Sequence, residues 1–319
     1  SGRHLPGWPV RAHGAFRMTQ PTVDILLPGH LDAVGESPVW SVAEQALYWV
    51  DIEAPALRRW SMADGQLTSW ATPERIACVA LHANGGLIAG METGVFHVRP
   101  GAAGLLDCTL LAMVHHQEPG MRFNDGRCDR QGRFWAGTMV RDMSLARPVG
   151  GLYRTDAAGL SAPQVQGLVT QNGLAFSPDG RTMYLSDSHP TVQTIWTLPL
   201  HDDGTVGERR LFVDMTDLPG RPDGAAVDAE GCYWICANDA GLVHRFTPDG
   251  RLDRSIRVPA SKPAMCSFGG PQLDLLFITS IRPGQPVGDD VAHGGAVFVT
   301  RPGVCGLPET LFSSTTPGQ

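Results

Sequence analysis

The length, composition and charge of the chain favour a large folded domain and exclude several classes of protein. The chain has 319 residues, of which 42% are hydrophobic and 18% charged, so it can bury a large core and is not intrinsically disordered. A net charge of −7 argues against a nucleic acid or an anionic membrane as partner. No apolar run approaches the roughly 20 residues of a transmembrane helix.

The first residues, SGRHLPGWPVRAHGAFR, lack the apolar core of a secretory signal. We expect residues 1–20 to form a disordered tail or one added in cloning, and residues 21–319 to form a single domain. Seven scattered cysteines without a CxxC pair indicate a reducing compartment. We therefore expect a cytoplasmic protein that acts as a monomer or a weak homo-oligomer.

From Thr22 onward, the predicted elements are short strands separated by turns rich in Gly and Pro. TVDILLPG (22–29) has strand character, and ESPVWSVAEQALYWVD (36–51) begins a series of similar units. The later units turn at HANGG (82), DRQGR (129), SPDGR (177), DAEGC (228) and GGPQL (269). A sixfold β repeat of about 40–50 residues is typical of an all-β, six-bladed β-propeller with four-stranded blades. We expect residues 22–29 to close the ring as the outer strand of the last blade, beside AVFVTRPG (296–303).

Polar residues recur at one register of this repeat. Counting back four positions from the last residue before each turn gives Glu36, Ala77, Asn124, Asn172, Asp223 and Ala264. The innermost strands of a propeller line its central channel, so equivalent positions form a ring. Such residues can be turn formers or solvated channel groups. However, two converging carboxylates repel each other unless a cation lies between them. Oxygen ligands favour one divalent ion, Ca²⁺ first, with Mg²⁺, Mn²⁺ and Zn²⁺ as alternatives.

Several segments resemble the regucalcin/gluconolactonase family, which includes senescence-marker and luciferin-regenerating proteins. They are GESPVW, RFNDGRCDRQGRFWAGTM, QNGLAFSPDGRTMYLSDS and PDGAAVDAEGCYWICANDAG. The resemblance implies a six-bladed propeller with one divalent metal at the channel mouth, and hydrolysis of sugar lactones. It implies that Glu36, Asn172 and Asp223 bind the metal and that Arg122 and Asn124 contact the substrate. The catalytic acid/base would be Asp223.

One stretch departs from the family pattern. Relatives place an acidic substrate contact after the GTM of the third repeat, and here GTMVRDMSLARP puts Arg141 or Asp142 in that neighbourhood. Asp187, in SDSHP, is a further candidate for a group near the metal. The tryptophans at 40, 49, 135 and 234 are expected in the core between blades.

A sugar lactone, with gluconolactone as the first candidate, is the substrate that the sequence favours. The alternatives are a phosphotriesterase- or arylesterase-type propeller hydrolase and a non-enzymatic calcium-binding propeller. Fold alone does not decide between them, because many propellers are scaffolds.

Overall fold

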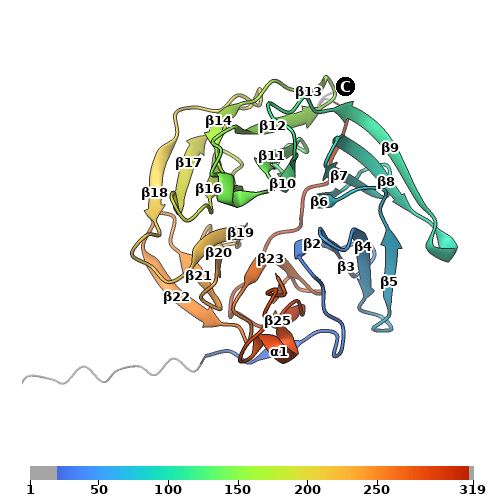
Figure 1. The fold of residues 1–319 in the computed structure, drawn as a ribbon, viewed down its shortest axis with the longest axis vertical. Helices are drawn as coiled ribbons and strands as arrows, with labels where there is room; N and C mark the ends of the chain where they lie inside the picture. The colour runs from blue at the N-terminus through green and yellow to red at the C-terminus, as the bar shows by residue number, and fades with distance from the viewer. Residues whose placement is uncertain (1–19, 316–319) are drawn as a thin grey trace, which may run out of the picture.

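The computed structural model describes residues 20–315 and forms a six-bladed β-propeller (Figure 1). The inner strand of each blade begins close to the central axis, and consecutive inner strands pack against one another around the ring. These inner strands are β2 (Gly35–Ser41), β6 (Ile76–Leu81), β10 (Met121–Cys128), β15 (Gln171–Phe176), β19 (Arg221–Val227) and β23 (Pro263–Gly269). The all-β fold and its sixfold repeat, predicted from the turn signatures, are confirmed.

Each inner strand pairs antiparallel with a second strand, and the blade then continues outward. The second strands are β3 (Ala46–Asp51), β7 (Leu87–Met91), β11 (Phe134–Val140), β16 (Thr182–Asp187), β20 (Tyr233–Asn238) and β24 (Leu275–Ser280). The third strands are β4 (Ala56–Ser61), β8 (Gly94–Pro100), β12 (Gly150–Asp156), β17 (Thr194–Pro199), β21 (Leu242–Phe246) and β25 (Phe298–Thr300). The predicted turn signatures lie between inner and second strands, as the repeat requires.

The outer strands complete the blades. They are β5 (Leu67–Ala71), β9 (Leu106–Met113), β18 (Arg210–Asp214), β22 (Leu252–Arg257) and, in the last blade, β1 (Val23–Ile25). In the third blade two short strands, β13 (Gly159–Leu160) and β14 (Val165–Leu168), share this position and both pair with β12. The helical segments are short: η1 (Ala102–Gly104), η2 (Met143–Leu145) and α1 (Asp290–His293). Within the described chain, none of the helices is both long and apolar enough to cross a membrane.

Ring closure follows the prediction. Strand β1 pairs antiparallel with β25, so that Val23 opposes Thr300 and the start of the chain completes the blade built by its end. The tail predicted for residues 1–20 lies outside the described residues, apart from Gln20.

Tryptophans fill the spaces between strands, as expected for core residues. Trp40, Trp49, Trp135 and Trp234 are at most 1% exposed. In three blades a buried Asp accepts a hydrogen bond from the indole N–H and another from an arginine Nε. The sets are Asp32 with Trp49 and Arg58, Asp129 with Trp135 and Arg133, and Asp228 with Trp234 and Arg245. Because the buried carboxylates are fully used in this way, they stabilise blades and do not form a reactive site.

After β25 the chain crosses the propeller at the end where the inner strands finish, and Figure 1 shows this segment passing through the centre of the ring. We call residues 304–315 the C-terminal strap. Its backbone bonds to three different blades, through Gly306 to Leu273, Phe312 to Leu81 and Ser313 to Gly132. Near the axis, Glu309 forms an ion pair with Arg127 of β10. The strap therefore covers the channel end opposite to the ring residues.

Candidate functional site

Every inner strand is irregular at the register of the predicted ring. The pairing with the second strand slips between Glu36 and Val39, Ile76 and Cys78, Phe123 and Gly126, Asn172 and Ala175, Pro222 and Ala225, and Pro263 and Met265. A β-bulge adds a residue to one strand, bends it and redirects side chains, and bulges are common beside active sites. The six ring positions thus share a backbone distortion as well as a register.

The backbone has a positive φ angle at the residues that follow two ring positions, in keeping with this distortion. Gly173, which follows Asn172, has a φ of +65°, and a Cβ there would lie 2.5 Å from Ser186 Oγ. Ser37, which follows Glu36, adopts a φ of +53° despite carrying a side chain. Residues other than glycine pay such a conformational cost mainly where the surrounding structure imposes it, often at functional sites.

The three predicted metal ligands are buried, with Glu36 8%, Asn172 4% and Asp223 6% exposed. In each side chain one polar atom is held by a neighbour. Ser37 N donates to Glu36 Oε2 at 3.1 Å, Asn172 Nδ2 donates to Ser188 Oγ at 2.9 Å, and Asn238 Nδ2 donates to Asp223 Oδ2 at 2.7 Å. Asn172 Oδ1 is buried and has no hydrogen-bond partner within residues 20–315. The Asn172 amide nitrogen is thus hydrogen-bonded, whereas its carbonyl oxygen has no hydrogen-bond donor. An oriented amide with an unpaired oxygen is the arrangement that a ligand of a hard cation needs.

The charges at the ring indicate the same requirement. Burial raises the pKa of Glu36 well above its usual value, and the negative charges of Asp223 and Asp125 raise it further. Burial also raises the pKa of Asp223 to about 7, with the charge of Asp125 adding to the shift, while Asn238 and Arg221 oppose it. A divalent cation would offset this repulsion. The residues present therefore fit a hard divalent ion, and Glu36, Asn172 and Asp223 are the candidates to hold it.

Arg122 and Asn124, the predicted substrate contacts, form one hydrogen-bonded unit. Arg122 Nη1 donates to Asn124 Oδ1 at 2.8 Å, and Asn124 Nδ2 donates to the carbonyl of Gln171 at 2.6 Å. Both ends of the Asn124 amide are thus engaged, in contrast to Asn172. This difference separates the fourth polar ring position from the three candidate ligands.

Asp125 is a buried carboxylate within charge range of Glu36 and Asp223 that sequence reasoning missed. It is 4% exposed, its Oδ2 accepts from Leu174 N at 2.8 Å, and its Oδ1 has no partner in the described chain. Burial raises the pKa of Asp125 to about 6. Regular strand alternation would place Asp125 on the face opposite to Asn124. The bulge after Phe123 breaks that alternation, and the NDG triplet was the signal that could have revealed it.

The structure distinguishes the two residues that follow the GTM segment. Asp142 caps η2, where its Oδ1 accepts hydrogen bonds from Ser144 N and Ser144 Oγ. Arg141 lies in charge range of Arg122 and 3.8 Å from the Glu92 carboxylate. Of these two residues, Arg141 is the one whose charge acts on the predicted substrate contact.

Asp187, the further candidate for a group near the metal, is engaged by the backbone of the loop that precedes Asn172. Its carboxylate accepts from the backbone N–H groups of Val169, Thr170 and His189. Asp187 therefore fixes the loop that leads into β15 and supports Asn172 through the backbone.

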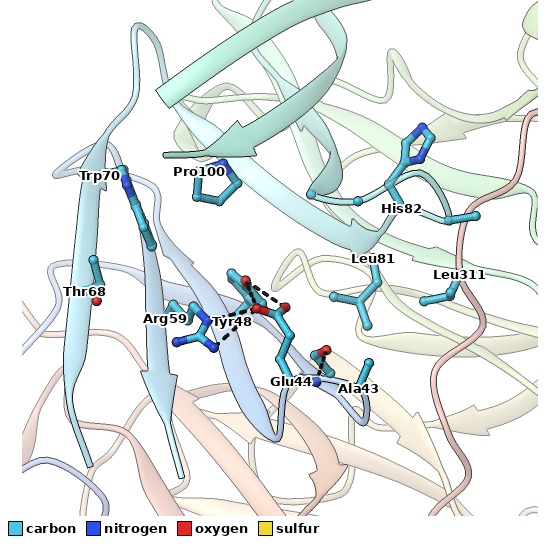
Figure 2. A pocket seen from close by; sticks show the side chains of 14 residues that line it. Ala43, Glu44, Tyr48, Arg59, Thr68, Trp70, Leu81, His82, Pro100 and Leu311 are labelled. Atoms are coloured by element: carbon cyan, nitrogen blue, oxygen red, sulfur yellow. Dashed lines mark hydrogen bonds and ion pairs between the residues drawn. The ribbon is translucent and has the colours of Figure 1, made fainter. Parts of the chain in front are cut away.

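Two other features lie at the far ends of the inner strands. A cavity of about 630 Å³ opens between the first and second blades, and Figure 2 shows Glu44 in it, paired with Tyr48 and Arg59. It is lined by Ser41 and Leu81, the last residues of β2 and β6, whereas Glu36 lies near the start of β2. Asp228, Glu230 and Cys232 also converge, but Asp228 is already bonded to Trp234 and Arg245. Neither feature forms part of the ring.

Comparisons with known proteins agree with the fold. A family model described as SMP-30/Gluconolactonase/LRE-like region matches residues 34–282. The chain is 40% identical over 283 residues to a 6-deoxy-6-sulfogluconolactonase of Pseudomonas putida, which covers 88% of this chain and 95% of that protein. It is 35% identical to an L-arabinolactonase of Azospirillum brasilense, over 92% of this chain and 96% of the other. A crystal structure of a calcium-binding protein, regucalcin, from Agrobacterium tumefaciens superposes with a TM-score of 0.83 at 28% identity, covering 92% of this chain and 98% of that one.

Proposed function

This chain belongs to the SMP-30/gluconolactonase/LRE-like family, and we propose that it hydrolyses sugar lactones with the help of one bound divalent cation. Glu36, Asn172 and Asp223 would hold the cation, with Ca²⁺ as the first candidate and Zn²⁺, Mg²⁺ and Mn²⁺ as alternatives. We further propose that it acts in the cytoplasm as a monomer or a weak homo-oligomer, without nucleic-acid or membrane partners.

The observation that carries this proposal is the shared arrangement of the three candidate ligands. Each lies on a bulge at the same register of a different blade, each is buried, and each has one polar atom fixed by a neighbour. The unpartnered Asn172 Oδ1 adds a buried acceptor that water or a cation must satisfy. A bound divalent cation would polarise the lactone carbonyl and stabilise negative charge on its oxygen.

The other groups of the ring supply orientation and proton transfer. Arg122 and Asn124 would donate hydrogen bonds to substrate oxygens from a unit that is already rigid. Asp223 would accept a proton from the attacking water and return it to the leaving ring oxygen. Its pKa of about 7 in the absence of a cation suits this exchange, and a neighbouring positive charge lowers that pKa so that the group is ionised at neutral pH.

A turnover assay on a panel of lactones tests the proposal. Protein stripped of metal with chelator should be inactive, and adding back single divalent metals should restore hydrolysis of sugar lactones above the spontaneous rate. Full activity in excess chelator would overturn the metal assignment. Turnover of phosphotriesters or aryl esters in place of lactones would favour the related hydrolase class, and no turnover at all would favour a binding propeller.

A further inference from the structure

We propose that Arg141, together with Arg122, selects sugar lactones that carry an anionic group at the end remote from the lactone carbonyl. This inference rests on the proposed lactonase function and specifies its substrate class. It arises from the end of β11, where Arg141 lies beside the strand that carries the predicted substrate contacts Arg122 and Asn124.

Arg141 is a cation without a firm partner. It follows β11 directly, and its backbone N–H donates to the carbonyl of Gly120 at 2.9 Å, which fixes the start of its side chain. The side chain is 38% exposed, and the carboxylate that it approaches in the described chain is that of Glu92 at 3.8 Å. This separation exceeds a hydrogen bond, so the guanidinium donors remain available.

The carboxylates nearby are already used by another arginine. Arg75 Nη1 donates to Glu92 Oε1 at 3.1 Å, and Arg75 Nε donates to Glu53 Oε2 at 3.1 Å. Arg122 bonds through Nη1 to neutral acceptors, the Asn124 amide and the Phe123 carbonyl. The guanidinium groups of Arg75 and Arg141 therefore share the Glu92 carboxylate, and Arg75 is the one that hydrogen-bonds to it.

Strand pairing places Arg141 close to Arg122, because Arg122 opposes Met139 and Met121 opposes Val140, the residue before Arg141. Burial lowers the pKa of Arg122, and the charge of Arg141 lowers it further, while Glu53 and Glu36 oppose the shift. The two guanidinium groups are thus close enough to repel each other. Between Glu36 and Asn124 the ring register carries Ala77, whose side chain is a single methyl group. A lactone whose carbonyl lies at Glu36, Asn172 and Asp223 would extend its far end past Arg122 toward Arg141. A carboxylate, phosphate or sulfonate there would be held by charge-assisted hydrogen bonds.

Steady-state kinetics with matched substrates test the proposal. The probes are D-glucono-1,5-lactone, which is neutral, 6-phospho-D-glucono-1,5-lactone, and D-glucaro-1,4-lactone, which carries a carboxylate. We expect wild-type kcat/KM to be at least tenfold higher for an anionic lactone than for the neutral one at low salt. Arg141→Met should reduce kcat/KM for that anionic lactone by about 10- to 100-fold, the usual effect of losing a hydrogen bond to a charged group. Its effect on the neutral lactone should be several-fold smaller, and Arg141→Lys should restore part of the preference.

Arg147→Met provides the control, because Arg147 is an exposed guanidinium in the same loop that is paired with Glu118. It should change neither preference nor rate. The phosphate and carboxylate arms show which anion the site accepts. Equal efficiency on neutral and anionic lactones, or equal losses on both in Arg141→Met, would overturn the inference while leaving the lactonase proposal intact. Failure to hydrolyse any lactone in the presence of metal would instead refute the proposed function.

Discussion

Replacing Asp223 by Asn should have opposite effects on the stability of the metal-free protein and on its activity. Asp223 is 6% exposed, and burial together with the charge of Asp125 raises its pKa from 3.8 to about 7. The folded protein thus binds this proton more tightly than the unfolded chain does. Because of that difference, the carboxylate lowers stability as pH rises from about 4 to about 7, and the cost persists at higher pH.

The size of this stability cost follows from the pKa shift of Asp223. One pKa unit corresponds to about 1.4 kcal/mol, so a rise from 3.8 to about 7 corresponds to about 4 kcal/mol above neutral pH. Glu36 and Asp125 share the same region and also take up protons, which reduces the gain from removing one charge. We expect Asp223→Asn to raise the free energy of unfolding in chelator by about 2–4 kcal/mol at pH 8, and by little at pH 4.

Urea unfolding in chelator at pH 4 and pH 8 measures this difference directly. Asp217→Asn, an exposed carboxylate in the loop before the same strand, is the matched control and should change stability by less than about 0.5 kcal/mol. With saturating metal the order should reverse, and kcat should fall by about 10²–10⁴-fold. A metal-free Asp223→Asn protein that is less stable than wild type at pH 8 would refute the electrostatic reasoning. Near-normal kcat at saturating metal would leave Asp223 as a ligand only.

Three further changes separate positioning, binding and stability. Ser188→Ala should weaken metal affinity by about 10- to 100-fold, because it removes the acceptor that orients the Asn172 amide. Calorimetric titration measures the affinity, and an unchanged value would contradict the proposed orientation. Arg122→Ala should mainly raise KM with metal content unchanged, whereas lost metal with unchanged KM would reverse the assigned roles. Glu309→Gln should lower the free energy of unfolding by about 3 kcal/mol, because Arg127 keeps a buried charge without its partner. An unchanged free energy of unfolding in urea would show that the ion pair does not anchor the strap.

The repeat and the ring could be predicted from sequence because both depend on local patterns. Turn signatures recur at regular spacing, and a fixed count back from each turn identified Glu36, Asn124, Asn172 and Asp223. Strand β1 was also predictable, because a propeller must close and the segment before the first repeat has strand character.

The remaining features depend on contacts between segments that are distant in sequence. Asp125 was missed because strand alternation assigns it to the wrong face, and only the paired strand reveals the bulge that turns it inward. The partners of Asp187 could not be read from sequence, because they are backbone N–H groups, which leave no trace in the identity of the residues around it. The strap was not predicted, because its anchors at Leu81, Gly132 and Leu273 belong to three separate blades.

The site shows how a symmetric repeat produces asymmetric chemistry. Six blades place six residues around the channel, and an identical polar residue at each position would crowd the axis with charge. Ala264 stands between Asp223 and Glu36 in the order of the blades and adds no polar group, and the two carboxylates are close enough for the charge of Asp223 to raise the pKa of Glu36. Ala77 lies on the other side of Glu36 in the same order and likewise adds no polar group. Because alanine stands at two of the six positions, the polar side chains of the ring are confined to Glu36, Asn124, Asn172 and Asp223.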